Sequence, residues 1–436
     1  MKHLILCVDG MADFAQPALG GKTTMEAAKT PHMDALAARG AIGRAQTSYP
    51  DLPCGSPVAN LAILGYDPHR YHPNGRSSFE ALAAGTRLRP GDLSFRCNLV
   101  TISKDADQKI ADFTAGQIDT DLAADLVWAY DIGDTKMELY VGQQYRHCLI
   151  VRDAHVPPDE LELAAPHCHQ QEPMLPLLPR GKTPRAAALA EKLRQFMLDS
   201  REHIARFNAK TPTQATMFWL WSAASSPLMP SFEHTFGKRA ALVCGLDFLK
   251  GIAIAAGIET KNIVGTTGYI DTNLRAKLRF TVNYLRNYDF VYLHVNALDE
   301  AAHNRDPLLK TKMLENLDTD IIGPLAQYLE RTHPNDWRMM VLPDHYTLSH
   351  DGTHHPRPVP VLVAGAGIQA TNQPRYTEAA AAGTPIVIGQ RLMEPFLSEN
   401  PLVWDEAFAA RANCGEEPLD HELEQQSLRV AGGMRG

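Results

Sequence analysis

Five residues of metal-binding types are concentrated in two short strings in the last third of the chain. The string V-N-A-L-D-E-A-A-H contains Asp299 and His303, and L-P-D-H-Y-T-L-S-H-D-G-T-H-H-P contains Asp344, His345 and His354. Carboxylates and imidazoles are common ligands of divalent cations in proteins. Together the two strings predict a catalytic centre that uses divalent metal ions.

Both strings follow apolar stretches, at residues 290–295 and 339–342, which are typical of buried strands. Asp299 and His303 are four residues apart and would share one face of a helix, although a surface Asp/His pair has the same spacing. His354 is our candidate ligand in the second string, with its neighbour His355 as the alternative. His350 is expected to be a bystander.

The composition excludes several classes of function. A net charge of −8 over 436 residues, with no run of Lys or Arg, excludes general nucleic-acid binding. Seven cysteines without C-x-x-C pairs indicate reduced thiols, as in the cytoplasm. Since no stretch of about 20 apolar residues exists, we expect a soluble cytoplasmic protein without a membrane partner. The sequence leaves the oligomeric state open, including a homo-oligomer.

Apolar strand-like stretches alternate with helix-like stretches near both ends of the chain, which is typical of an α/β layer fold. In the first part a strand is expected at 3–8 and a helix at 32–39, with Pro31 at its start and Gly40 after its end. In the last part the expected strands are 240–244, 263–264, 290–295, 339–342 and 359–364, and the expected helices are 248–256, 277–286 and 308–331.

The middle of the chain differs, with short strand-like pieces at 93–102, 137–140 and 147–151 and a helix at 184–207. We therefore expect a discontinuous core domain, residues 1–88 and 211–400, with an inserted α+β domain at residues 89–210. Residues 401–436 are rich in Glu, Gln and Gly and are expected to form a peripheral tail.

Two residues in the first part of the chain could belong to the same site. Asp9 ends the first apolar stretch and is a candidate ligand, although a turn Asp is the commoner role. Ser56, in P-C-G-S-P-V-A-N-L, precedes an apolar helix-like run. It could cap that helix or act as a nucleophile stabilised by a metal and by helix N–H groups, and the residues alone favour the cap.

Several strings occur in an order that resembles the archaeal-type cofactor-independent (2,3-bisphosphoglycerate-independent) phosphoglycerate mutases of the alkaline phosphatase superfamily. They are the first D-G, G-S-x-x-A-N-L-x-x-L-G-Y-D-P, G-R-S-S-F-E-A, F-R-C-N-L, D-E-A-A-H and P-D-H. The resemblance extends over about residues 1 to 395. It implies an alkaline-phosphatase-like, doubly wound core with a mostly parallel sheet and an inserted cap domain, which binds substrate.

The resemblance also implies a role for each candidate residue. Ser56 would be the nucleophile that is transiently phosphorylated. One metal would be held by Asp299, His303 and His354, and the other by Asp9, Ser56, Asp344 and His345. The resemblance therefore implies two divalent metal ions, and Mn, Zn, Mg and Co all suit such ligands.

Four polar residues are candidates for binding the substrate. Arg76 and Arg96 lie in the strings G-R-S-S-F-E and F-R-C-N, and a guanidinium can hold phosphate or carboxylate oxygens with two hydrogen bonds. Asn98 and Lys312 are further candidates. The alternative for each is a structural ion pair or hydrogen bond.

The chain departs from the mutase pattern at three places. Pro57 follows Ser56 where the family usually has an acid, residues 114–117 read T-A-G-Q instead of R-A-G-R, and Leu342 and Pro343 precede Asp344. Together with Q-Y-R-H (144–147), F-W-L-W (218–221) and G-Y-I-D-T-N (268–273), these changes resemble a bacterial subgroup described as proposed homoserine kinases. The chain has no P-loop, so recognition of a phosphate donor is unexplained.

Three hypotheses follow from these residues. The first is a metal-dependent phosphoglycerate mutase that converts 3-phosphoglycerate to 2-phosphoglycerate through a phosphoserine, so that its partner is a small phosphorylated metabolite. The second is phosphorylation of a small amino-acid hydroxyl, as in a homoserine kinase, with the same serine and metals. The third is a non-catalytic relic that binds a metal or a metabolite.

Overall fold

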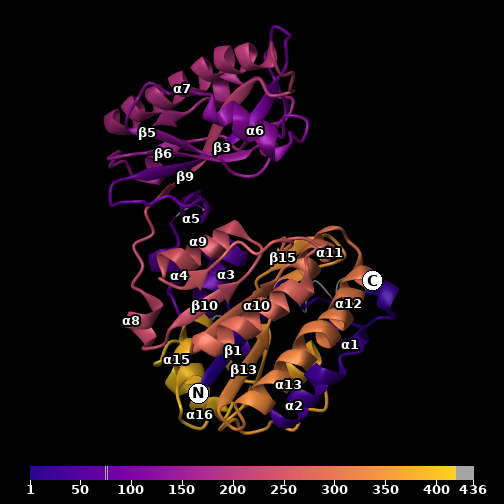
Figure 1. Cartoon of the computed structure of the whole chain (residues 1–436). Helices are drawn as coiled ribbons and strands as arrows, with labels where there is room; N and C mark the ends of the chain where they lie inside the picture. Colours follow the sequence, from indigo (N-terminus) through magenta and orange to yellow (C-terminus); the bar gives the residue numbers. More distant parts are fainter. Residues whose placement is uncertain (74, 76, 419–436) are drawn as a thin grey trace. The chain divides into compact units, whose positions relative to one another are not determined.

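The computed structural model describes residues 1–73, 75 and 77–418, which form two compact units (Figure 1). Unit 1 comprises Met1–Tyr71, Pro230–Leu249 and the chain from residue 256 onward. Unit 2 comprises His72–Met229 and Lys250–Ala255. Unit 2 therefore includes more residues than the insert expected at 89–210. A strand at Met217–Ser225 belongs to its sheet.

Unit 1 is built on an eight-stranded sheet with the strand order β11-β10-β12-β1-β13-β16-β2-β17. Neighbouring strands are parallel except where β16 meets β13 and β2. This confirms the predicted α/β class with a mostly parallel sheet. The strands are β1 (Lys2–Val8), β2 (Ala41–Gln46), β10 (Ala240–Val243), β11 (Glu259–Thr260), β12 (Phe290–Val295), β13 (Trp337–Leu342), β16 (Val359–Gly365) and β17 (Ile386–Ile388).

The two faces of this sheet differ in polarity because side chains alternate along each strand. On one face Leu4, Leu6 and Val8 join an apolar core beneath α2 (Pro31–Arg39), α10 (Leu274–Asn287), α12 (Pro307–Leu317) and α13 (Gly323–Thr332), of which α10, α12 and α13 cross the sheet in Figure 1. On the other face Tyr292 donates a hydrogen bond to Asn60 of α3 (Ser56–Ile63) at 2.6 Å. The polar face therefore lies beneath the helix that begins at Ser56.

Two expected elements differ from the structure. The helix expected at 308–331 is interrupted by a π-helical turn, Asp318–Ile322. The carboxylate of Asp318 accepts hydrogen bonds from the backbone N–H groups of His32 and Met33. The strand expected at 263–264 is wrong, since these residues form a turn and the edge strand is β11. Val264 is 95% exposed, whereas Ile263 is 6% exposed and joins the apolar core from a loop rather than from a strand.

Unit 2 contains a five-stranded antiparallel sheet in which β3 is the central strand. The helix α7 (Pro184–Asn208) packs on this sheet through Leu193, Met197 and Ile204. The expected strands and helix of this region appear with nearly the expected bounds. The strands are β3 (Leu93–Ile102), β4 (Ile110–Asp112), β5 (Met137–Tyr140), β6 (Arg146–Val151) and β9 (Met217–Ser225).

The remaining helices and strands are short. They are α1 (Thr24–Ala27), α4 (Pro68–Tyr71), α5 (Ser77–Ala83), α6 (Thr120–Trp128), β7 (Leu161–Glu162), β8 (Arg180–Gly181), α8 (Phe232–Phe236), α9 (Asp247–Ala255), α11 (Ala297–His303), β14 (Tyr346–Leu348), β15 (Thr353–His355), α14 (Glu378–Ala381), α15 (Met393–Leu397) and α16 (Glu406–Ala412). Among the residues that the structure describes, no helix has the length and apolar character of a membrane span.

Residues 401–418 pack on the core rather than forming the expected peripheral tail. Trp404 fills the space above Gly43, where an added Cβ atom would lie only 1.8 Å from the indole. Asn413 accepts a hydrogen bond from the backbone N–H of Ile388 in β17 at 2.9 Å. Composition could not reveal this packing, because it depends on one glycine far away in the sequence. Residues 419–436 of the expected tail lie outside the described residues.

Arg338 of β13 is fully buried and secures the segment before Trp404. Its guanidinium donates hydrogen bonds to five backbone carbonyls, of Ala366, Pro395, Phe396, Ser398 and Asn400, at 2.6–3.4 Å. Removing the guanidinium leaves several of these acceptors buried without a partner.

We expect Arg338→Met to lower the free energy of unfolding by about 3 kcal/mol, since each unsatisfied buried acceptor costs about 1–3 kcal/mol. Chemical denaturation checks this, with Arg331→Met as the control because Arg331 is exposed near the end of α13. Equal stability of the two variants would contradict the role given to Arg338.

Candidate active site

The structure brings all seven predicted metal-centre residues together at one edge of the unit 1 sheet. The carboxyl ends of parallel strands share an edge, so the segments that follow β1, β12 and β13 meet there. Asp9 follows β1, Asp299 and His303 lie on α11 after β12, Asp344 and His345 follow β13, His354 lies in β15, and Ser56 begins α3.

The first group consists of Asp299, His303 and His354. The Nε2 atom of His303 lies 3.2 Å from Asp299 Oδ2, and that of His354 lies 3.4 Å from Asp299 Oδ1. The two Nε2 atoms are 3.1 Å apart. Two imidazoles and one carboxylate thus converge on one point, as the ligands of a single cation do.

The second group consists of Asp9, Asp344, His345 and Ser56. The Nε2 atom of His345 lies 3.6 Å from both Asp9 Oδ1 and Asp344 Oδ2. The Ser56 hydroxyl lies 3.1 Å from the same nitrogen and donates to Asp9 Oδ2 at 3.4 Å. The two groups are neighbours, since one ligand atom from each of Asp299, His345 and His354 lies within 4.8 Å of the others.

All three imidazoles present the same nitrogen to the cluster. The Nδ1 atoms of His303 and His354 lie 2.7 Å and 3.1 Å from the backbone carbonyls of Gly352 and Cys54, which can only accept hydrogen bonds. The Nδ1 atom of His345 lies 3.2 Å from the hydroxyl of Thr347. We therefore assign the proton to Nδ1 in each ring, which leaves the Nε2 lone pairs for a metal.

The three carboxylates of the cluster are almost completely removed from solvent. Asp9 and Asp344 are 0% exposed and Asp299 is 6% exposed. Burial raises the pKa of Asp9 well above its usual value, and the charges of Asp344 and Asp299 raise it further. Burial acts in the same direction on Asp299, but hydrogen bonds from His303 and His354 hold its pKa well below the usual value.

This cluster fits divalent cations. Three ionised carboxylates that are removed from solvent repel one another unless positive charge lies between them. Burial lowers the pKa of His354, but its contact with Asp299 and the other groups around it together raise it more, so the pKa lies above its usual value. The contact with Asp299 also raises the pKa of His303, to about 9. Bound cations would supply positive charge between these carboxylates and imidazoles.

The hydroxyl of Ser56 does not cap α3. Ser56 is the first helical residue, the cap position belongs to Gly55, and the side chain of Ser56 points to Asp9 and His345. Pro57 takes the second helical position, where its missing N–H costs no hydrogen bond. The structure thus favours the alternative in which Ser56 belongs to the chemical site.

Several polar residues that support the ligands were not identified from the sequence. Thr347 donates to Asp299 Oδ1 at 2.6 Å and also contacts His345, so one hydroxyl joins both groups. Asn60 donates to Asp344 Oδ2 at 3.0 Å. Asn60 stands in the quoted string G-S-P-V-A-N-L, which was a usable signal, whereas no motif marked Thr347.

A buried lysine, Lys310, lies near the site, two positions before the predicted Lys312. Lys310 is 0% exposed and donates to Asp13 Oδ2 at 3.0 Å and to the carbonyl of Thr347 at 2.7 Å. Lys312 points the other way on α12, is 63% exposed and pairs with Glu315. Residues two apart on a helix face different sides, so Lys310 contacts the residues beside the site whereas Lys312 faces solvent.

The other predicted substrate residues lie in unit 2, apart from Arg76, which is outside the described residues. Arg96 pairs with Glu80 at 2.9 Å, and its guanidinium lies 4.4 Å from the ring centre of Trp221. Asn98 accepts a hydrogen bond from the indole N–H of Trp221 at 3.0 Å. Arg96 and Asn98 are therefore part of one cluster on the unit 2 sheet.

The alternative ligands in the second string lie outside the cluster. His355 packs against Phe14, with ring centres 5.0 Å apart, and His350 is 53% exposed beside Asp351. The structure thus places His354, rather than His355, among the ligand atoms.

Comparisons with known proteins point to one family. A family model described as 2,3-bisphosphoglycerate-independent phosphoglycerate mutase matches residues 37–208. A protein of that name from Methanothermobacter thermautotrophicus is 38% identical over 385 residues, which cover 87% of this chain and 92% of the relative. A probable enzyme of the same name from Geobacter sulfurreducens is 35% identical, with 91% of this chain and 100% of the relative covered.

Solved structures share the fold. A protein from Pyrococcus horikoshii superposes with a TM-score of 0.73 at 25% identity, covering 96% of this chain and 99% of that chain. A cofactor-independent phosphoglycerate mutase from Thermoplasma acidophilum superposes with a TM-score of 0.62 at 24% identity, covering 91% and 98%.

We expect Thr347→Val to weaken binding of divalent cations by about 10- to 100-fold, as loss of a hydrogen bond behind the ligands typically does. Metal content after dialysis at a series of free Mn²⁺ concentrations measures this. Thr319→Val is the control, since Thr319 is exposed and bonds only within its own helical segment. Equal metal affinity in the two variants would refute the role of Thr347.

We also expect the stability to depend on pH through Glu378, which accepts hydrogen bonds from Thr23 and the backbone of Asp13. Burial raises the pKa of Glu378 to about 7. A raised carboxyl pKa stabilises the fold below the unfolded value of about 4.3, and this contribution disappears as the pH rises through 7.

Glu378→Gln should therefore flatten the loss of stability between pH 5 and pH 8 by up to about 3 kcal/mol. Urea unfolding at both pH values tests this against Glu406→Gln, a change at an exposed position. A wild-type pH dependence that persists in Glu378→Gln would assign it to other groups.

Proposed function

Because this chain belongs to the 2,3-bisphosphoglycerate-independent phosphoglycerate mutase family, we propose that it is a metal-dependent enzyme that interconverts 3-phosphoglycerate and 2-phosphoglycerate through phospho-Ser56. The observation that carries the proposal is the position of the Ser56 hydroxyl. It contacts Asp9 and His345 within the carboxylate and imidazole cluster, at the N-terminal end of α3.

Each transfer in this reaction makes one bond to phosphorus and breaks another. The Ser56 oxygen attacks the phosphorus of 3-phosphoglycerate, the bond to the 3-oxygen breaks, and the proton lost by Ser56 balances the one gained by the released hydroxyl. The 2-hydroxyl of the bound glycerate then attacks phospho-Ser56 and regenerates the serine. Retaining glycerate without water between these steps prevents hydrolysis.

The residues of unit 1 suit this chemistry. Asp9, Ser56, Asp344 and His345 would hold one cation, and Asp299, His303 and His354 the other. Two bound divalent cations would stabilise the serine alkoxide and the charge on the phosphoryl oxygens. The open end of α3 adds backbone N–H groups and a favourable helix dipole close to the Ser56 oxygen.

A second candidate function is supported by the cluster in unit 2. Arg96 and Glu80 place a positive and a negative charge side by side, which matches the carboxylate and ammonium groups of an amino acid such as homoserine. At the position of the family's R-A-G-R string, the hydroxyl of Thr114 donates to Asp112 at 2.7 Å. That loop has no arginine for a trianionic substrate, so an amino-acid hydroxyl is the alternative acceptor.

The cellular setting also enters the proposal. All seven cysteines are free, which supports a reducing compartment and hence the cytoplasm. The partner in either function is a small metabolite that carries or receives a phosphoryl group.

We expect Ser56→Ala to lower mutase turnover by about 10³-fold or more, since removing a nucleophile abolishes the covalent path. Phosphorus NMR of Mn²⁺-loaded protein with 3-phosphoglycerate measures turnover, and intact mass measures phosphate on the enzyme. Ser398→Ala is the control. This serine lies in the segment whose backbone is bound by Arg338 and is not one of the cluster residues.

The outcomes separate the hypotheses. Turnover of 3-phosphoglycerate by the wild type supports the mutase. Inertness toward it, with homoserine phosphate formed from homoserine and ATP, favours the second function. A phosphate that remains on Ser56→Ala contradicts the assignment of the nucleophile, and absence of both reactions and of cation binding supports the relic hypothesis.

A further inference from the structure

A second set of metal-binding side chains lies directly beneath the active-site cluster, on the polar face of the unit 1 sheet. Cys7 of β1 is the register partner of His294 in β12 and of Leu342 in β13. Asp344 follows Leu342 by two residues. Register partners in a parallel sheet point to the same face, about 4.8 Å apart, so this topology places a thiol beside an imidazole.

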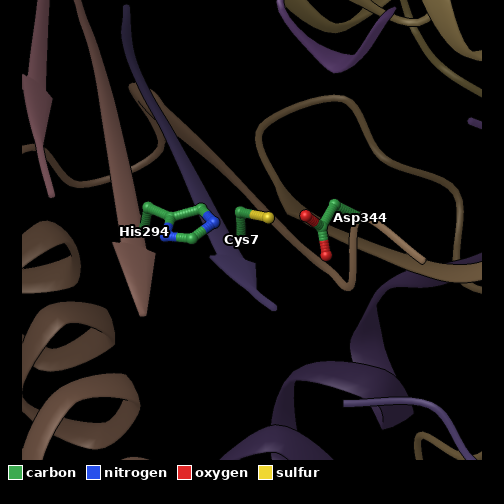
Figure 2. A group of neighbouring side chains, drawn as sticks. All are labelled: Cys7, His294 and Asp344. Atoms are coloured by element: carbon green, nitrogen blue, oxygen red, sulfur yellow. The ribbon is translucent and has the colours of Figure 1, made fainter. Parts of the chain in front are cut away.

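The side-chain geometry brings these groups within reach of one ion. One ligand atom from each of Cys7, His294 and Asp344 lies within 4.8 Å of the others, and all three residues are 0% exposed. Figure 2 shows Cys7 between the other two, with its sulfur directed toward Asp344. Shifts of about 1 Å would bring these atoms to the separations found around a tetrahedral ion with bonds of about 2.0–2.3 Å.

The imidazole of His294 is the observation that points to a ligand. Among the described residues, neither ring nitrogen of His294 has a hydrogen-bond partner, although the ring is fully buried. Its Nε2 atom lies 3.4 Å from Asp9 Oδ2 without the geometry of a hydrogen bond. His303, His345 and His354 differ, since each has a partner for Nδ1.

We propose that Cys7, His294 and Asp344 form a third cation site, specific for a thiophilic divalent ion such as Zn²⁺ or Co²⁺, which shares Asp344 with the active-site cluster. Sulfur, imidazole and carboxylate ligands suit these ions, whereas Mg²⁺ prefers oxygen alone. On binding, the Cys7 thiol loses its proton to solvent and a metal–sulfur bond forms. The thiolate and the carboxylate then neutralise the double charge of the ion.

Sharing Asp344 has a structural consequence for the site above. Asp344 Oδ2 accepts the hydrogen bond from Asn60, which also donates to the backbone carbonyl of Ser56. An ion bound to Asp344 from below competes with Asn60 for this carboxylate. Occupancy of the third site thereby acts on the helix turn that carries Ser56, and it does so whichever acceptor the enzyme uses.

Cobalt provides a direct test, because a thiolate bound to Co²⁺ gives a charge-transfer band in the near ultraviolet. The ligands proposed for the active-site cluster contain no sulfur. We expect the full chain titrated with Co²⁺ to develop this band, and Cys7→Ser to lose the band and one equivalent of bound cobalt. His294→Asn should raise the cobalt concentration for half-maximal band by about 10-fold or more.

Two controls address other thiols. The backbone carbonyl of Cys54 lies 3.1 Å from His354 Nδ1, which places this cysteine beside the active-site cluster, so Cys54→Ser must keep the band. Cys168 and Cys414 are exposed, and their double replacement by serine must also keep it. If circular dichroism shows that Cys7→Ser is unfolded, the cobalt concentration for half-maximal band in His294→Asn tests the third site instead.

The proposal is overturned if the wild type shows no band, or if the band persists in folded Cys7→Ser. Loss of the band in Cys54→Ser instead would assign thiolate binding to the other cysteine and equally overturn it. Each readout is independent of phosphoryl transfer, so failure of the third site is distinguishable from failure of the proposed mutase activity.

Discussion

Three aspartates with little or no exposed surface, Asp9, Asp299 and Asp344, meet at one edge of the unit 1 sheet. Their meeting is a consequence of topology, because β12, β1 and β13 are neighbouring parallel strands whose chains leave the sheet at the same edge. Away from water, each ionised carboxylate makes ionisation of the others more costly. Divalent cations would relieve this repulsion, and the imidazole Nε2 atoms and the Ser56 hydroxyl are directed toward these carboxylates. The arrangement of the site therefore depends on this one electrostatic constraint.

The orientation of the imidazoles is set by groups that are not ligands. Backbone carbonyls hold Nδ1 of His303 and His354, and the Thr347 hydroxyl holds that of His345 while donating to Asp299. Lys310 in turn binds the carbonyl of Thr347. The cluster is thus supported by a buried polar network in which each donor has an acceptor, and this network fixes which nitrogen faces a cation.

Family membership and the departures from the family pattern concern different parts of the chain. The candidate ligands of unit 1 lie in strings that resemble those of the family, and they surround the Ser56 hydroxyl. Pro57 alters the first turn of α3 at no cost in hydrogen bonds. The loop at residues 114–117 and the pair Arg96 and Glu80 lie in unit 2, so a change in charge there would leave the candidate ligands of unit 1 unchanged.

The sequence by itself determined the α/β class and most elements of the inserted region, because apolar periodicity acts over a few neighbouring residues. The set of seven candidate ligands came from its resemblance to a family. The sequence also predicted a strand at 263–264 and a peripheral tail at 401–436, and it gave no signal for Lys310, since each of these depends on what packs against the segment. Only the tertiary structure decided that Thr347 joins two ligands, that Trp404 fills the space above Gly43 and that Cys7 lies beside His294. These contacts depend on packing between separate segments of the chain. For Cys7 and His294 the cause is strand register, which no local pattern encodes.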